Sequence, residues 1–197
     1  HGWSGGNACD SVDAYARVVL GLLDCARIEC AVLAGHSLGG GIAQRIALSH
    51  PDRVAGLILV GTGARMSVAP QILEELRTDF GRAVDLIIGW AFGSDAPYTL
   101  IQRERHRMLA LSPDVLQKDF DACNAFDVIG SIRCWSGPTL VVSGSEDRMM
   151  PVKYSHYLAQ NISGALLELI SGAGHMVLLE RPTKLAEAIE VFMAQFR

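Results

Sequence analysis

The chain has 197 residues, half of them hydrophobic, and a formal net charge of −4. Its length suggests a single domain with room for an insertion, and its apolar content allows a large buried core, which excludes a disordered chain. The chain has no long charge run and no apolar stretch of the roughly 18–20 residues that span a bilayer, so neither nucleic acid nor a membrane is expected as a partner.

The first predicted element is a helix that begins behind Ser11, after a glycine-rich start. Serine is a good N-cap residue, and the apolar residues that follow recur at the spacing of one helix face. These apolar residues are Val12, Tyr15, Val19, Leu22, Leu23 and Ala26. The pattern predicts an amphipathic helix from Val12 to about Ala26.

An apolar run over residues 30–36 predicts a strand that is buried on both faces. It breaks into Gly35-His36-Ser37-Leu38-Gly39, and a helical segment over residues 39–49 follows. A sharp turn from strand to helix pushes one side chain out at the top of a sheet, and the flanking glycines leave room for the strained backbone. This context makes Ser37 a candidate nucleophile.

Further strands are predicted at residues 54–60, 139–143 and 166–170. A helix beginning near Pro151 separates the last two strands, and a final helix follows Pro182. Strands that alternate with helices imply parallel βαβ units. The predicted fold class is therefore α/β.

Residues 64–133 interrupt this alternation, because they show helical pieces and no clear buried strand. The helical pieces cover residues 71–80, 83–92 and 113–124. We predict that residues 1–63 and 134–197 form the α/β core and that residues 64–133 are a helical insertion.

Three predicted strands end in residues that can act together. Ser37 follows the first strand, Asp147 the third and His175 the fourth. Loops at the carboxyl ends of parallel strands meet at one edge of a sheet. A serine hydroxyl needs a base to take its proton, which His175 would do, and Asp147 would hold and stabilise the imidazole.

Each of these residues also has a purely structural explanation. Ser37 could be a turn residue, Asp147 a turn former or helix N-cap, and His175 a loop histidine. Glu146 could be the acid in place of Asp147. His36 adjoins the turn but should point the other way along the strand. The remaining histidines lie at a helix end or on helix surfaces: His50, His106 and His156.

With these motifs in place, the sequence resembles the α/β-hydrolase superfamily, close to its single-domain esterase and lactonase-like members. The matching segments are Gly35-His36-Ser37-Leu38-Gly39-Gly40, His50-Pro51-Asp52-Arg53-Val54, Pro138–Asp147, and Gly174-His175-Met176 with Leu179-Glu180-Arg181-Pro182. The resemblance implies an α/β-hydrolase fold, with a mostly parallel sheet flanked by helices. It also implies that Ser37 is the nucleophile, Asp147 the acid and His175 the base, and that residues 64–133 are a cap over the active site.

The N-terminal segment departs from the family pattern. His1-Gly2-Trp3-Ser4 resembles the loop after the family's fourth strand, because only one helix fits between residue 6 and the strand at residue 30. Reading it as the oxyanion loop would require a helix, a strand and another helix there. We therefore expect an N-terminally truncated fold in which Leu38 supplies one oxyanion N–H and the second donor is absent from the chain. Such a segment alone should be poorly soluble and weakly active or inactive.

The predicted function is that of a serine hydrolase that cleaves small carboxylic esters or lactones through an acyl-enzyme. A carbon–carbon bond hydrolase and a cofactor-free perhydrolase of the same fold are alternatives, and a low-turnover ligand-binding member is another. A serine at position 37 argues against the dehalogenating relatives, which carry aspartate there. Candidate substrate contacts are His36, Trp90, Phe92, Met149 and Met176.

The sequence contains no metal-ligand cluster, phosphate loop or dinucleotide fingerprint, so we expect no metal and no cofactor. The only expected partner is a small acyl substrate, and the oligomeric state is left open. The five cysteines are scattered and odd in number, which predicts reduced thiols and a cytoplasmic protein. A targeting signal ahead of His1 would not be visible.

Overall fold

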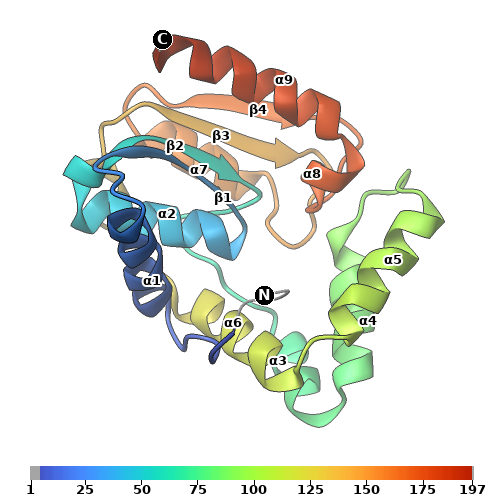
Figure 1. The fold of residues 1–197 in the computed structure, drawn as a ribbon. Coiled ribbons are helices and arrows are strands. Elements are labelled where there is room, and N and C mark those ends of the chain that lie inside the picture. Colours follow the sequence, from blue (N-terminus) through green and yellow to red (C-terminus); the bar gives the residue numbers. More distant parts are fainter. Residues whose placement is uncertain (1–4, 197) are drawn as a thin grey trace.

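A computed structural model of the chain describes residues 5–196, and the predicted His1–Ser4 loop lies outside the described residues. Its centre is a four-stranded parallel sheet in the order β1-β2-β3-β4, with helices on both faces (Figure 1). The strands are β1 (Ala31–His36), β2 (Val54–Val60), β3 (Thr139–Gly144) and β4 (Leu166–Ile170). The α/β prediction and all four strand positions are confirmed.

Alternation along the two central strands creates two apolar layers. In β2, Leu57 and Leu59 pack on one face while Ile58 and Val60 pack on the other. In β3, Val141 lies on the first face. Side chains that alternate in this way bury both faces of the central strands, as expected where helices cover a parallel sheet.

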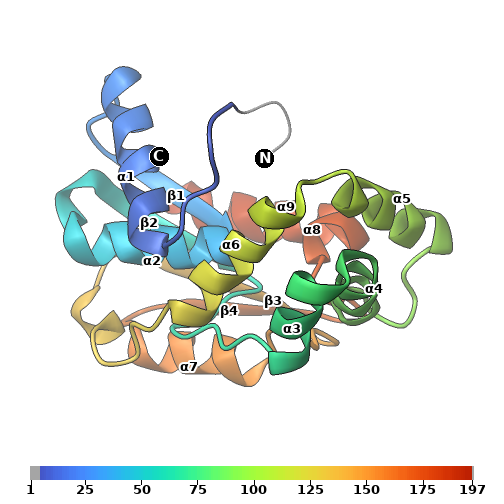
Figure 2. The same cartoon turned by 90° about the horizontal axis from the view of Figure 1, so that it is seen from below.

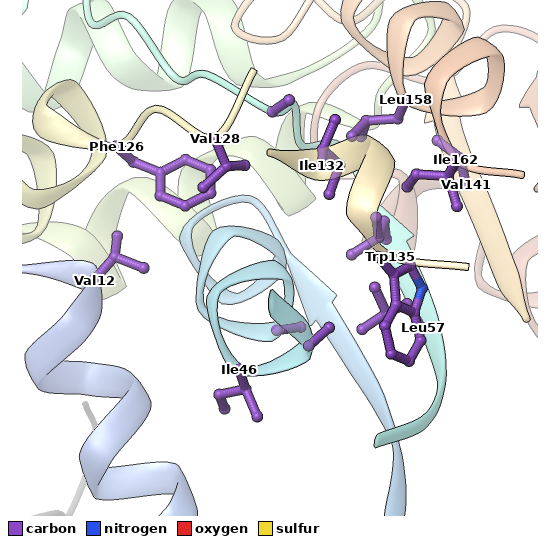
Figure 3. Packing of buried hydrophobic residues seen from close by; sticks show 14 of the residues in the cluster. Val12, Ile46, Leu57, Phe126, Val128, Ile132, Trp135, Val141, Leu158 and Ile162 are labelled. Carbon is purple, nitrogen blue, oxygen red and sulfur yellow. The ribbon is translucent and has the colours of Figure 1, made fainter. Parts of the chain in front are cut away.

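Helices α1 (Val12–Cys25), α2 (Leu38–Ser49) and α7 (Lys153–Asn161) contribute to the layer beside Leu57. Figure 3 shows this cluster, to which Ile46 of α2, Leu158 of α7 and Trp135 belong. Helices α8 (Val177–Glu180) and α9 (Pro182–Met193) contribute to the opposite layer. None of the helices within residues 5–196 is long and apolar enough to cross a membrane.

Two expectations about burial are wrong. Strand β1 is only partly buried, with Ala34 exposed, because β1 lies at the end of the described sheet and pairs with β2 alone. Leu22 belongs to the apolar set of α1 but is 67% exposed. The Ser11 cap is confirmed, since its hydroxyl accepts the N–H of Ala14 at 3.3 Å.

Four helices between β2 and β3 form a helical lobe beside the sheet (Figures 1 and 2). They are α3 (Pro70–Thr78), α4 (Phe80–Ala91), α5 (Tyr98–Leu109) and α6 (Pro113–Ala125). The lobe has its own apolar cluster, which includes Ile72, Ile87 and Leu116.

The chain segments that lead into and out of this lobe are joined to each other. Val128 donates its N–H to the carbonyl of Ala64 at 2.7 Å. Met66 and Phe126 belong to the apolar layer of the sheet rather than to the cluster of the lobe. The lobe is therefore anchored at its base. The division of the chain at residues 64 and 133 stays a prediction.

Candidate active site

Loops at the carboxyl ends of three strands bring the predicted site residues together. Ser37 follows β1 directly, Asp147 lies in the loop after β3, and His175 lies in the loop after β4. All four strands are parallel, so these loops leave the same edge of the sheet. In Figure 1 the arrowheads of β3 and β4 point toward the side on which the helical lobe lies.

Ser37 occupies a strained turn. Its φ of 52° and ψ of −118° lie outside the ordinary regions for a residue with a side chain. Its N–H donates to the carbonyl of Val60 at 2.9 Å, which ties the turn to β2. A Cβ at Gly35 would come within 2.2 Å of the carbonyl oxygen of Gly39. The turn is so tight that only glycine fits at position 35.

The turn places Ser37 at the N-terminal end of α2. Leu38 is the first residue of that helix, and the N–H groups of a first helical turn have no carbonyl partner within the helix. They carry the positive end of the helix dipole. The Leu38 N–H is therefore chemically suited to stabilise negative charge beside Ser37.

Asp147 and His175 form a buried pair. Oδ2 of Asp147 lies 2.9 Å from Nδ1 of His175, and both residues are about 95% buried, with 5% and 4% of their surface exposed. The other carboxylate oxygen of Asp147 accepts the N–H of Met150 at 2.7 Å. Because a carboxylate only accepts hydrogen bonds, the shared proton lies on Nδ1 and leaves Nε2 free to act as a base.

Glu146, the alternative acid, is directed elsewhere. Its Oε2 accepts the N–H of Ser94 at 2.7 Å, and this hydrogen bond lowers the pKa of the carboxyl. The geometry therefore favours Asp147 over Glu146 as the partner of His175.

His36 does not point away from the site as the strand alternation predicted. Its ring lies 4.7 Å from the ring of His175, and its Nε2 is 2.9 Å from the carbonyl oxygen of His175. Burial, together with the nearby His175, lowers the pKa of His36 to about 4. The imidazole of His36 is therefore neutral near pH 7 and donates from Nε2 to that carbonyl.

Two adjoining cavities, of about 780 and 520 Å³, meet at Ser37 and His175. Phe120 and Met149 line both cavities, so they lie where the two meet. Within residues 5–196 the Ser37 hydroxyl makes no hydrogen bond to the His175 ring. Hydrogen bonds between catalytic groups often tighten only when substrate is bound.

All five expected substrate contacts line these cavities. His36, Phe92 and Met176 line the larger one, Trp90 lines the smaller one, and Met149 lines both. His106, expected to be a solvated helix residue, also lines the larger cavity. Phe120 was not anticipated, since a single aromatic residue on a helix gives no sign of which way it faces.

Residues 1–188 of the chain match the sequence model of a family described as the alpha/beta hydrolase family. The chain is similar to 2-hydroxymuconate semialdehyde hydrolase from Pseudomonas putida, with 31% identity over 92% of this chain and 68% of that protein. The chain thus spans about two thirds of that relative's length.

Solved structures show the same likeness. A thermophilic esterase superposes with a TM-score of 0.91 at 38% identity, covering 99% of this chain and 77% of that one. Est816, described as an N-acyl homoserine lactone degrading enzyme, superposes with a TM-score of 0.86 at 27% identity, covering 98% of this chain and 79% of that one.

Proposed function

The chain belongs to the alpha/beta hydrolase family, and on this basis we propose that it is a serine hydrolase that cleaves small carboxylic esters or lactones through an acyl-enzyme. The observation that carries the proposal is the buried Asp147–His175 pair, because His175 lines the same cavity as the strained Ser37. The esterase and lactonase similarities support the choice of bond.

In this mechanism His175 Nε2 takes the proton of the Ser37 hydroxyl as Ser37 Oγ attacks the substrate carbonyl. The Leu38 N–H stabilises the oxyanion of the tetrahedral intermediate. When the intermediate collapses, the bond to the leaving oxygen breaks and His175 returns its proton to that oxygen. The acyl group is then held on Ser37.

Deacylation repeats these steps with water. His175 takes a proton from a water molecule, the resulting hydroxide attacks the acyl carbonyl, and the proton passes to Ser37 Oγ as the acid leaves. Asp147 holds the Nδ1 proton throughout, so Nε2 is correctly oriented and its charged form is stabilised.

The cavities support an apolar acyl substrate. Side chains around the larger cavity include Ile87, Ile88, Phe92 and Met176. A carbonyl held at Ser37 would have one cavity on either side, so the acyl chain and the leaving group would occupy different ones. The helical lobe would then act as a cap over the bound substrate.

Carbon–carbon bond hydrolysis is the second candidate, because 2-hydroxymuconate semialdehyde hydrolase is a relative at 31% identity. The same serine, acid and base would serve both reactions. A panel of p-nitrophenyl esters, lactones and 2-hydroxymuconate semialdehyde separates the two candidates. Turnover of the esters or lactones supports the first candidate, and turnover of the semialdehyde supports the second.

Labelling with a fluorophosphonate, followed by peptide mapping, tests the nucleophile directly. We expect an adduct on Ser37 in the unaltered chain and none in S37A. Ser67 also lines the smaller cavity, so S67A is the matched control and should still be labelled on Ser37. Folded chain without an adduct on Ser37 would contradict the proposal.

A further inference from the structure

The end of α4 and the loop that follows it bond to the residues next to Asp147 and to those next to His175. Residues 89–94 of the helical lobe bond to Gly174 and Met176, which flank His175, either directly or through Glu180. They also bond to Glu146 and Arg148, which flank Asp147. The lobe is thus fastened to the chain next to each member of the pair.

On the His175 side the link is Glu180. Its Oε2 accepts the N–H of Gly93 and its Oε1 accepts the N–H of Gly174, each at 2.9 Å. Met176 adds a third bond by donating its N–H to the carbonyl of Ala91 at 3.0 Å.

The backbones of the two glycines lie against each other. A Cβ at Gly174 would come within 2.4 Å of the nitrogen of Gly93, so no larger residue fits there. This close approach places the two N–H groups on the same carboxylate.

Arg148 and Glu146 make the corresponding links on the Asp147 side. The guanidinium of Arg148 donates to the carbonyls of Gly89, in the last turn of α4, and of Phe92, just after the helix. Glu146 accepts the N–H of Ser94. These groups are more exposed than Glu180, which is only 7% exposed.

Glu180 has no ion pair within residues 5–196, although its carboxylate is buried. A buried carboxylate is costly unless it is well bonded, and here two backbone N–H groups, one on each oxygen, supply that bonding. Both of those N–H groups belong to loops that touch the site. The carboxylate therefore links the lobe to the loop of the base, and it has no other side-chain partner among residues 5–196.

We propose that Glu180 is a positioning residue. By accepting the N–H groups of Gly93 and Gly174, it couples the position of α4 to the orientation of His175 toward Asp147 and Ser37. The proposal rests on the proposed function for its kinetic consequences. Its structural consequence, the geometry of the His175–Asp147 bond, holds whether or not the chain turns over a substrate.

E180Q is the informative substitution because it preserves shape and removes one acceptor. A glutamine has one oxygen and one NH₂, so one of the two N–H groups would face a donor and lose its bond. We expect kcat for a p-nitrophenyl ester to fall about 10- to 100-fold with KM changed less than about threefold. E180D keeps both acceptors and the charge on a shorter side chain, so it should recover part of the loss.

The second readout needs no turnover. The tautomer of His175 is followed by NMR of ¹⁵N-histidine-labelled chain, with the His175 signal assigned by its loss in H175Q. His175 faces Asp147 and His36 directly, and Glu180 through Gly174. In E180Q we expect a weaker preference for the proton on Nδ1, because the loop that carries His175 loses part of its bonding to the lobe.

E187Q is the matched control, since Glu187 is an exposed residue of α9 whose carboxylate contacts Lys184. It should behave as the unaltered chain in both measurements. An unchanged His175 signal in folded E180Q would overturn the proposal. If E180Q does not fold, the same NMR measurement on E180D decides, and a signal like that of the unaltered chain overturns it.

The two proposals can fail separately. Absent turnover in the unaltered chain together with a shifted His175 signal in E180Q would count against ester hydrolysis and for the positioning role. Normal turnover in E180Q with an unchanged signal would count against the positioning role alone.

Discussion

His36 Nε2 lies 2.9 Å from the carbonyl oxygen of His175, and the two imidazole rings are 4.7 Å apart. The residue immediately before the candidate nucleophile therefore holds the backbone of the candidate base. The strained turn and the His175 loop are joined by this contact, so distortion of one is expected to reach the other.

The lowered pKa of His36 makes the stability of the fold depend on pH. In the unfolded chain His36 binds a proton below about pH 6.5, whereas in the folded chain it does so only below about pH 4. The free energy of unfolding therefore decreases as the pH falls from about 6.5 to about 4. The loss should reach about 3 kcal/mol. H36Q removes the titrating group, so its unfolding free energy should fall less between pH 7.5 and 4.5 in urea titrations. H156Q, an exposed change on α7, should leave the loss unaltered, and an equal loss in H36Q would refute the assignment.

D147N is expected to reverse the tautomer of His175. The oxygen of the new amide would keep the bond from the Met150 N–H, which directs the NH₂ group toward Nδ1. The Nδ1 atom would then accept, and the proton would sit on Nε2, where the base is needed. We expect kcat to fall about 10⁴-fold with little change in KM. D114N, on the exposed side of α6, serves as control, and a loss of less than tenfold in D147N would contradict the role of Asp147.

Replacing Gly35 or Gly39 of the turn with alanine should change the stability of the fold in opposite directions. A Cβ at Gly35 meets backbone atoms of Gly39 and Gly40, whereas a Cβ at Gly39 meets nothing within 4 Å. G35A should lose about 1–3 kcal/mol of stability or more, because the backbone of the turn must move. G39A should be neutral or gain up to about 1 kcal/mol, because alanine favours a helix. Urea unfolding of both variants measures the difference, and similar values for both would be inconsistent with the tight turn.

Cys123 lines the smaller cavity but is expected to be a poor nucleophile. Burial raises the pKa of its thiol to about 12, so little thiolate is present near neutral pH. Iodoacetamide at pH 8 should modify the exposed Cys30 and Cys134 well before Cys123, as peptide mapping over time would show. All of these thiols should react at similar rates in urea. Early modification of Cys123 in the folded chain would contradict the burial of its thiol.

The strands were predictable because apolar runs bounded by glycine and proline have few other structures. The predicted strand at 54–60 coincides with β2, and the loops after β1, β3 and β4 hold the three residues selected from the sequence. The position of His36 was not predictable from strand alternation. That rule assumes continuing extended backbone, but the strand ends at His36 and the next residue has a positive φ.

Contacts between segments far apart in the sequence were also beyond prediction. Glu180 was part of a recognised motif, yet its partner Gly93 lies in the middle of the insertion. Phe120 lines both cavities only because of the way α6 packs. Periodicity reports that a helix has a buried face, but it carries no information on which neighbour covers that face.

The bond at the base of the helical lobe allows the lobe to vary independently of the sheet. The lobe leaves the sheet and returns at points joined by the bond between Ala64 and Val128, while β2 and β3 remain neighbours. Insertions of new length or shape between these points would leave the strand register intact, so the part of the cavity lining that the lobe supplies can diverge without changes to Ser37, Asp147 and His175. A transplanted lobe would still have to present backbone groups to Glu180, Glu146 and Arg148, and these requirements limit which lobes are interchangeable.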